Sequence, residues 1–134
     1  MLPVRTIAAV LALLVAAGAV AQESIVDRWY QALLKADGPT LSQLLADNAT
    51  IRLDDIGVTQ SKAEFIASMD EWQVAVKGAK IRHKIEAEMG ETTVVRTCYD
   101  FPNNDMTTRE TFTARNGLIV ANTQMTIGEN CDGF

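Results

Sequence analysis

Three polar side chains, those of His83, Tyr99 and Glu110, interrupt stretches in which every second residue is largely apolar. Such alternation is typical of a strand with one buried face, so we expect these side chains to point into a core or a pocket. A carboxyl group removed from water has a raised pKa, and a histidine titrates near neutral pH, so the set is suited to proton transfer. His83 could act as a general base beside Asp27, Asp54 or Glu110; alternatively, it is a core histidine satisfied by one hydrogen bond.

The stretches that carry these residues belong to a run of four segments with strand-like alternation. The segments span residues 80–89, 92–101, 106–115 and 118–127. Turn signals separate them, and the last, Asn116-Gly117, is the strongest short signal for a hairpin. We therefore predict a four-stranded antiparallel meander. The alternation of the fourth segment assigns its inward face to Ile119, Ala121, Thr123, Met125 and Ile127.

The first half of the chain predicts three helices that cover one face of this sheet. Apolar residues recur at helical spacing in residues 24–35, in a short segment that follows Pro39 and ends at residues 47–48, and in residues 61–77. Ser61 and Glu64 form a capping box at the start of the third helix. A short strand is predicted at residues 49–53. Helices segregated to one face of an antiparallel sheet define an α+β fold, and a twisted sheet covered in this way encloses a cone.

The opposite face of the predicted sheet is polar and basic. It carries Arg82, Lys84, Arg96, Arg109 and Arg115, together with Thr107, Thr111 and Thr113. The simplest interpretation is a solvated face. The alternative is a surface for a homodimer or another protein partner, which would require acidic residues such as Glu86, Glu88 and Asp100 to interleave with the basic ones.

Residues 1–21 have the layout of a secretory signal peptide. Arg5 precedes an apolar run at residues 7–17, and Ala19-Val20-Ala21 matches an A-x-A cleavage site. The apolar run is too short to cross a bilayer, although an uncleaved N-terminal anchor is the alternative. We therefore expect a secreted or periplasmic mature protein, residues 22–134, with no membrane-spanning part.

Composition limits the classes of ligand and partner. Cys98 and Cys131 are the only cysteines, and an even number in an exported chain predicts a disulfide, with two free thiols as the alternative. No C-x-x-C motif or histidine–carboxylate spacing indicates a metal or another cofactor, and we expect neither. The net charge of −5 at pH 7 over 134 residues disfavours nucleic acid and anionic membrane surfaces as partners.

Several local motifs occur in the same order as in a known superfamily. They are Val-Asp-Arg-Trp-Tyr-Gln-Ala-Leu at residues 26–33, Leu-Leu-Ala-Asp-Asn-Ala-Thr-Ile at residues 44–51, Gly57, and Arg115-Asn116-Gly117. The chain thus resembles the NTF2-like superfamily, and within it the SnoaL-like proteins and ketosteroid isomerase. The resemblance implies a cone-shaped pocket for a small apolar molecule. Candidates for its lining are Trp29, Tyr30, Met69, Trp72, Tyr99, Phe112 and Met125, although such residues could equally form plain core.

The resemblance also implies catalytic roles. Asp54 stands at the position of a general-base aspartate, and Glu110 at that of a protonated acid in an oxyanion hole. A neutral Glu110 would donate a hydrogen bond to a developing enolate while an ionised Asp54 took the proton. Trp29 stands where the resemblance expects an oxyanion-binding tyrosine, which Tyr99 could replace. We therefore expect an exported protein that binds a small apolar molecule. The alternatives are an isomerase or lyase that uses these acids and His83, or an accessory domain that binds a partner through its sheet.

Overall fold

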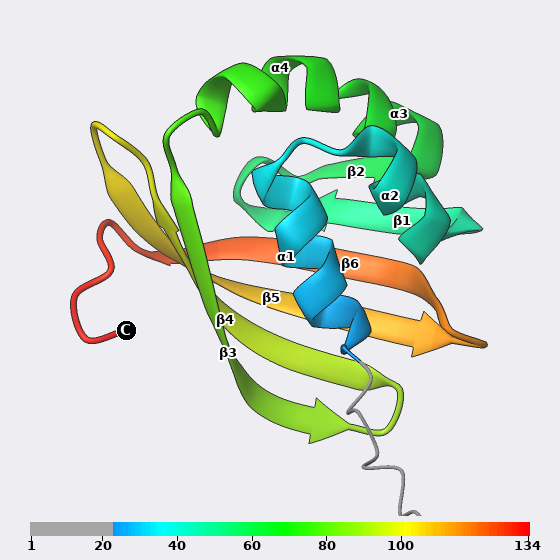
Figure 1. Cartoon of the computed structure of the whole chain (residues 1–134). Coiled ribbons are helices and arrows are strands. Elements are labelled where there is room, and N and C mark those ends of the chain that lie inside the picture. The colour runs from blue at the N-terminus through cyan, green and yellow to red at the C-terminus, as the bar shows by residue number, and fades with distance from the viewer. Residues whose placement is uncertain (1–22) are drawn as a thin grey trace, which may run out of the picture.

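A computed structural model describes residues 23–134, and the predicted signal peptide lies outside them. A curved sheet of six strands has the order β2-β1-β6-β5-β4-β3 (Figure 1). The strands are β1 Leu45–Leu53, β2 Val58–Ser61, β3 Lys80–Met89, β4 Thr92–Asp100, β5 Asp105–Arg115 and β6 Leu118–Gly128. The helices are α1 Ile25–Leu34, α2 Gly38–Leu44, α3 Lys62–Ala67 and α4 Met69–Ala75, with a short 3-10 helix η1 at Asp54–Ile56. The helices lie on one side of the sheet, which confirms the α+β cone.

The predicted meander is confirmed, because β3, β4, β5 and β6 pair antiparallel in sequence order. The rest of the sheet was not predicted fully. β1 pairs in parallel with β6 and antiparallel with β2, so the sheet is mixed rather than antiparallel throughout. β2 escaped detection because it has four residues and only one of them is even partly buried, which leaves no alternation to recognise.

Boundaries of the second and third predicted helices are wrong, and β1 begins at Leu45 rather than at residue 49. The third predicted helix, residues 61–77, is divided into α3 and α4. The capping box of Ser61 and Glu64 is present, but the Ser68 hydroxyl donates to the Phe65 carbonyl, and such a bond to the preceding turn bends a helix. The second helix ends at Leu44 rather than at residues 47–48, because Leu45 is buried and already pairs with Ile119 of β6.

The inward face predicted for the last strand is wrong beyond Ile119, because β6 contains a bulge. Ala114 pairs with Ile119, but Thr113 pairs with Ala121, so Val120 is an extra residue. A one-residue shift moves every later side chain to the opposite face of a strand. Asn122 is therefore buried opposite Phe112, and Gln124 lies opposite Glu110. Of the residues predicted to point inward there, Ala121 and Thr123 therefore lie on the other face, Met125 is 41% exposed, and Ile127 is the extra residue of a second register shift, where Thr108 pairs with Thr126 and Thr107 with Gly128.

Trp29 anchors the core between α1 and the inner face of the sheet. Its ring is fully buried, stacks on Phe65 with ring centroids 5.2 Å apart, and meets Phe112 edge-on at 5.6 Å. Such aromatic pairs stabilise a fold beyond the apolar area that they bury. The Trp29 indole Nε1 has no hydrogen-bond partner. This residue therefore serves packing, and it fixes α1 over the centre of the sheet.

The segment after β6 is attached to the outer face of the sheet. A disulfide joins Cys98 of β4 to Cys131, with the Cα atoms 5.6 Å apart. The Thr107 hydroxyl donates to the Asn130 carbonyl at 2.7 Å, and the Cys131 amide donates to Asp105 at 2.9 Å. These contacts hold the C-terminal segment on the side away from the helices (Figure 1). Within residues 23–134, no helix is both long and apolar enough to cross a membrane.

Candidate binding site

A cavity of about 530 Å³ lies between the inner face of the sheet and helices α3 and α4. Its walls are largely apolar and include Leu33, Leu53, Phe65, Met69, Trp72 and Met106. The Trp72 indole Nε1 donates to the Leu33 carbonyl in the last turn of α1 at 2.7 Å, and the same carbonyl also accepts from the Ala36 amide at 3.0 Å. The Trp72 bond fixes α4 against the end of α1, and thereby sets the height of the cavity.

A buried carboxyl group with hydroxyl donors lies behind one wall of the cavity. Glu110, on β5, has no exposed surface. Its Oε1 accepts from the Tyr30 hydroxyl at 2.8 Å, and its Oε2 accepts from the Tyr99 and Thr108 hydroxyls at 2.6 and 2.7 Å. Thr97 donates in turn to the Tyr30 oxygen at 2.7 Å. Every oxygen of the carboxyl is therefore satisfied by neutral donors alone.

The protonation of Glu110 reflects two opposing effects. Burial raises the pKa of this carboxyl, whereas hydrogen bonds from Tyr99, Thr108 and Tyr30 lower it, and the net result is a raised pKa. Burial and the neighbouring Glu110 charge also raise the pKa of Tyr99 well above its ordinary value, so this hydroxyl keeps its proton. The hydrogen-bond donors to Glu110 are thus hydroxyl groups rather than cationic side chains.

Tyr99 and Thr108 connect this network to the cavity. Both residues border the cavity, whereas Glu110 and Tyr30 lie behind them. Sheet register explains the grouping, because Tyr99 lies on β4, and Thr108 and Glu110 are two residues apart on the same face of β5. A ligand in the cavity would therefore meet the hydroxyl oxygens of Tyr99 and Thr108, and would sense Glu110 through them.

The polar part of the cavity wall comes mainly from its opening. Asp55 of η1 and Glu71 of α4 are exposed and border the cavity. Asp55 accepts from both the backbone amide and the hydroxyl of Thr126, at 3.1 and 2.6 Å. Gln60 and Gln124 also border the cavity. The bonds between Asp55 and Thr126 place η1 against the end of β6 and hold the Asp55 carboxylate in position.

No protein-family model matches the sequence, and no curated protein matches it. Solved structures do match in fold. IdmH from Streptomyces antibioticus, assigned as a polyketide cyclase, is 17% identical and has a TM-score of 0.66 over 76% of this chain and 88% of that chain. An NTF2-like protein of unknown function from Burkholderia xenovorans LB400 is 19% identical and has a TM-score of 0.65 over 81% of this chain and 85% of that chain. The chain has the NTF2-like fold.

A third NTF2-like structure agrees with the other two in fold. It is a protein from Kribbella flavida DSM 17836 assigned as a ketosteroid isomerase, with 11% identity and a TM-score of 0.63 over 77% of this chain and 75% of that chain. The resemblance to ketosteroid isomerase in the sequence therefore corresponds to a real similarity of backbone. At these identities the likeness concerns the fold, and side-chain roles have to be judged on the geometry of this chain.

The three predicted catalytic residues do not converge on the cavity of this NTF2-like cone. Asp54 forms an exposed ion pair with Arg52 at 2.7 Å and does not border the cavity; its neighbour Asp55 does. Successive residues of a 3-10 helix point about 120° apart, so one step along η1 separates a cavity residue from a solvent residue. Glu110 lies directly behind Tyr99 and Thr108 of the cavity wall, whereas His83 stacks on Tyr30, which does not border the cavity.

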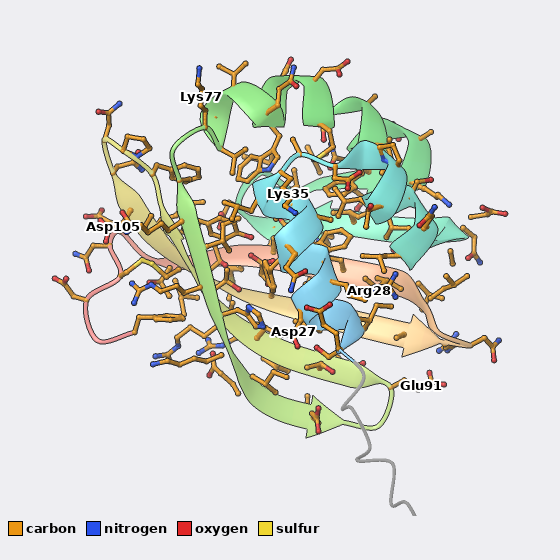
Figure 2. All side chains as sticks on the ribbon, in the orientation of Figure 1. Asp27, Arg28, Lys35, Lys77, Glu91 and Asp105 are labelled. Carbon is orange, nitrogen blue, oxygen red and sulfur yellow. A yellow bond between two sulfur atoms is a disulfide. The ribbon has the colours of Figure 1, made fainter. Side chains whose placement is uncertain are left out.

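His83 forms a separate pair with Asp27 of α1. Its Nε2 lies 2.7 Å from the Asp27 carboxylate, and its ring stacks on Tyr30 with centroids 4.8 Å apart. Asp27 lies at the N-terminal end of α1 (Figure 2). A hydrogen bond from Ser24, followed by the contact with His83, lowers the pKa of Asp27. Neither residue of the pair borders the cavity, so the pair orients Tyr30 rather than facing a ligand.

The predicted lining residues divide into two groups. Met69, Trp72, Tyr99 and Met125 border the cavity, whereas Trp29, Tyr30 and Phe112 are buried in the core and do not. Polar and charged lining residues that sequence reasoning missed include Asp55, Gln60, Glu71, Gln124 and Thr126. The β6 bulge concealed Gln124 and Thr126, and no sequence pattern distinguishes Asp55 from Asp54. Among residues 23–134, no group of three or more histidine, cysteine, aspartate or glutamate side chains could hold a metal ion.

Proposed function

We propose that this protein is exported and binds a small, largely apolar molecule in the cavity between α3, α4 and the sheet. The single observation that supports it is the cavity itself, about 530 Å³ with largely apolar walls. Sites for small ligands usually have volumes of about 300–1,000 Å³, with mainly apolar walls and a few polar groups that orient the ligand. The disulfide between Cys98 and Cys131 fits an oxidising compartment and supports export.

Trp72 offers a direct readout of binding. Its ring borders the cavity, and its Nε1 is tied to Leu33, so a ligand would change its surroundings without releasing it. Trp29 is fully buried in the core and gives a background signal. We expect an environment-sensitive apolar fluorophore to bind the mature protein and to quench the emission of Trp72. In Trp72→Phe protein, the emission of Trp29 should stay constant during the same titration.

A pair of neighbouring substitutions tests whether binding occurs in the cavity. Ala75 borders the cavity at the end of α4, whereas Val74 is 74% exposed and does not. Ala75→Trp should fill space that the ligand needs and abolish fluorophore binding, and Val74→Trp should leave it intact. Equal affinities for the two variants would contradict the proposal, provided that their circular dichroism spectra match that of the unmodified protein.

A second candidate function is that of an isomerase or lyase. It is favoured by the carboxyl of Glu110 hydrogen-bonded to Tyr99 at the cavity wall, with the Asp55 carboxylate on the same cavity. Asp55 would remove a proton from carbon next to a carbonyl group, and the C–H electron pair would move to the carbonyl oxygen. A protonated Glu110 would donate to the Tyr99 oxygen, which would free the Tyr99 hydroxyl to donate to that enolate.

Deuterium exchange into the α-position of a cyclic ketone tests this second candidate. We expect exchange that depends on Asp55 and is lost in Tyr99→Phe and in Asp55→Asn protein. Asp54→Asn is the matched control, because Asp54 is paired with Arg52 and does not border the cavity. Exchange equal to that of buffer alone would leave binding as the function of the cavity.

A further inference from the structure

We propose that the cavity selects a protonated amine carried on an apolar body. This inference rests on the proposed binding function and specifies its ligand class. It depends on three properties of the cavity wall: its charge, the direction of its hydrogen bonds, and its aromatic surface.

The charge of the wall excludes anions. Among residues 23–134, the charged side chains that border the cavity are the carboxylates of Asp55 and Glu71, and no lysine, arginine or histidine joins them. Lys77, which follows α4, points away from the sheet (Figure 2). An anionic ligand would lose its hydration in the cavity and meet only like charge, whereas a cation would meet opposite charge.

The hydrogen bonds of the inner wall leave acceptors rather than donors. The Tyr99 and Thr108 hydroxyls each donate to Glu110, at 2.6 and 2.7 Å. A hydroxyl has one hydrogen and two lone pairs, so a hydroxyl whose hydrogen is already donated can only accept from a ligand. Glu110 thus turns two neutral side chains into acceptors on the cavity side.

Other hydrogen-bond donors of the cavity wall also donate to the protein itself rather than to the cavity. The Thr126 hydroxyl donates to Asp55 at 2.6 Å, the Ser68 hydroxyl donates to the Phe65 carbonyl, and the Trp72 Nε1 donates to Leu33. Apart from the side-chain amides of Gln60 and Gln124, the wall offers few hydrogens to a ligand that brings only acceptors. An ammonium group carries three donors and no acceptor, and it is the functional group that matches such a wall.

The aromatic side chains of the cavity wall explain why the ligand should carry an apolar body. Phe65, Trp72 and Tyr99 border the cavity, and a cation near the face of an aromatic ring gains a further attraction. Asp55 and Glu71 are exposed, whereas Phe65 and Tyr99 are buried. The apolar body therefore packs inside against an inner wall that offers no hydroxyl hydrogen, and the ammonium group stays near the opening, where Asp55 and Glu71 can accept from it and it remains partly hydrated.

Three probes with the same body and different heads test this inference. They are phenylbutylamine, phenylbutanol and phenylbutyrate, titrated against the mature protein at neutral pH and low salt by calorimetry and by Trp72 emission. We expect the amine to bind about tenfold more tightly than the alcohol, since each carboxylate in this partly exposed setting contributes up to about fivefold. The carboxylate probe should bind most weakly, and added salt should reduce the advantage of the amine.

Two substitutions that each remove one negative charge test whether the preference for the amine arises at the cavity. Glu71→Gln should lower the ratio of amine to alcohol affinity about two- to fivefold. Glu88→Gln, on β3 and outside the cavity, should leave that ratio unchanged. Equal affinities for amine and alcohol would overturn the amine proposal and leave the binding function standing. Failure of all three probes to bind would overturn the binding function as well, and an amine preference unaffected by both Glu71→Gln and Asp55→Asn would also overturn the proposal.

Discussion

Two carboxyl groups on opposite faces of the same sheet show opposite behaviour. Glu110 on the inner face is fully buried and accepts from three hydroxyls. Glu86 on the outer face accepts from Arg96 at 3.3 Å and Arg109 at 3.4 Å. Burial raises the pKa of Glu110. Burial acts in the same direction on Glu86, but the hydrogen bonds and charges of Arg109 and Arg96 outweigh it and lower the pKa of that carboxyl.

The difference shows how this chain distributes charge. Basic side chains are concentrated on the outer face, where acids meet them: Glu86 lies between Arg96 and Arg109, and Glu91 pairs with Arg115 at 2.7 Å. The inner face satisfies its carboxyl with neutral groups. Arginine at the cavity would bind carboxylate and phosphate ligands in a bidentate manner, and no arginine of residues 23–134 borders it, which agrees with the proposed cationic ligand.

Removal of the Glu110 or the Glu86 side chain should give the largest difference in stability between the two faces of the sheet. Glu110→Ala leaves three buried hydroxyls without their acceptor and creates a void, so we expect a loss of about 3–5 kcal/mol in the free energy of unfolding. Glu86→Ala should cost less than about 1 kcal/mol, because it breaks a surface network. Urea denaturation measures both. Similar losses for the two variants would mean that burial does not distinguish the two faces.

Loss of the disulfide should destabilise the outer face without affecting the cavity. The bridge spans a sequence separation of 33 residues. Constraint of a loop of this length in the unfolded chain corresponds to about 3–4 kcal/mol in the chain-entropy model. The Cys98→Ala/Cys131→Ala protein should unfold at lower urea concentration than the parent, while the affinity for phenylbutylamine stays the same. A parallel fall in affinity would show that the two faces are coupled.

The pH dependence of stability should have opposite signs at the two carboxyls. The raised pKa of Glu110 means that its contribution to stability is fully present below about pH 4.5 and is lost as the pH rises through the folded-state pKa. Glu110→Gln protein should therefore gain stability relative to the parent as the pH rises, by at most about 1.4 kcal/mol per pH unit.

Glu86→Gln is the matched comparison for this titration. The lowered pKa of Glu86 stabilises the fold above about pH 4.5, and this contribution is lost as the pH falls. The Glu86→Gln protein should therefore lose stability relative to the parent at neutral pH, and should approach it in acid. Unfolding curves from acid to neutral pH would show two slopes of opposite sign, and slopes of one sign would refute the comparison.

The outer face is a candidate surface for a homodimer, and a charge reversal there should have the smallest effect on stability. Arg109→Glu places an acid beside Glu86 and removes one of its two partners. We expect weaker self-association in sedimentation equilibrium, a change in stability below about 1 kcal/mol, and unchanged binding in the cavity. An identical molar mass for parent and variant across the concentration range would favour a solvated face.

Local sequence signals predicted the elements well where one side of an element is buried. The alternation in β3, β4 and β5 placed Tyr99 and Glu110 on the inner face, where they meet. The capping box of Ser61 and Glu64 marked the start of α3. The cysteine pair was predicted from composition and compartment. Each of these signals comes from a few neighbouring residues, and the burial or hydrogen bonding of those same residues forms the element. The element can therefore be recognised from the sequence alone.

The cavity, in contrast, depends on contacts between distant residues. The bulge at Val120 exchanges the two faces of β6, and a step of one residue along η1 puts Asp55 rather than Asp54 on the cavity. Neither the bulge nor the orientation of Asp55 changes the local pattern of apolar residues. The bulge depends on pairing with β5, and the position of Asp55 depends on its contact with Thr126 of β6. Tyr30 and Tyr99 likewise reach one carboxyl from a helix and a strand.

The amino-acid sequence by itself determined the α+β cone, the four-stranded meander and a protonatable group on its inner face, since burial of alternating apolar residues drives each of these. Only the tertiary structure decided that Glu110 is surrounded by hydroxyls, that His83 pairs with Asp27 away from the cavity, and that the cavity wall presents acceptors. Those properties arise from the packing of α1 and α4 onto a bulged sheet, where an offset of one residue selects which side chains can meet.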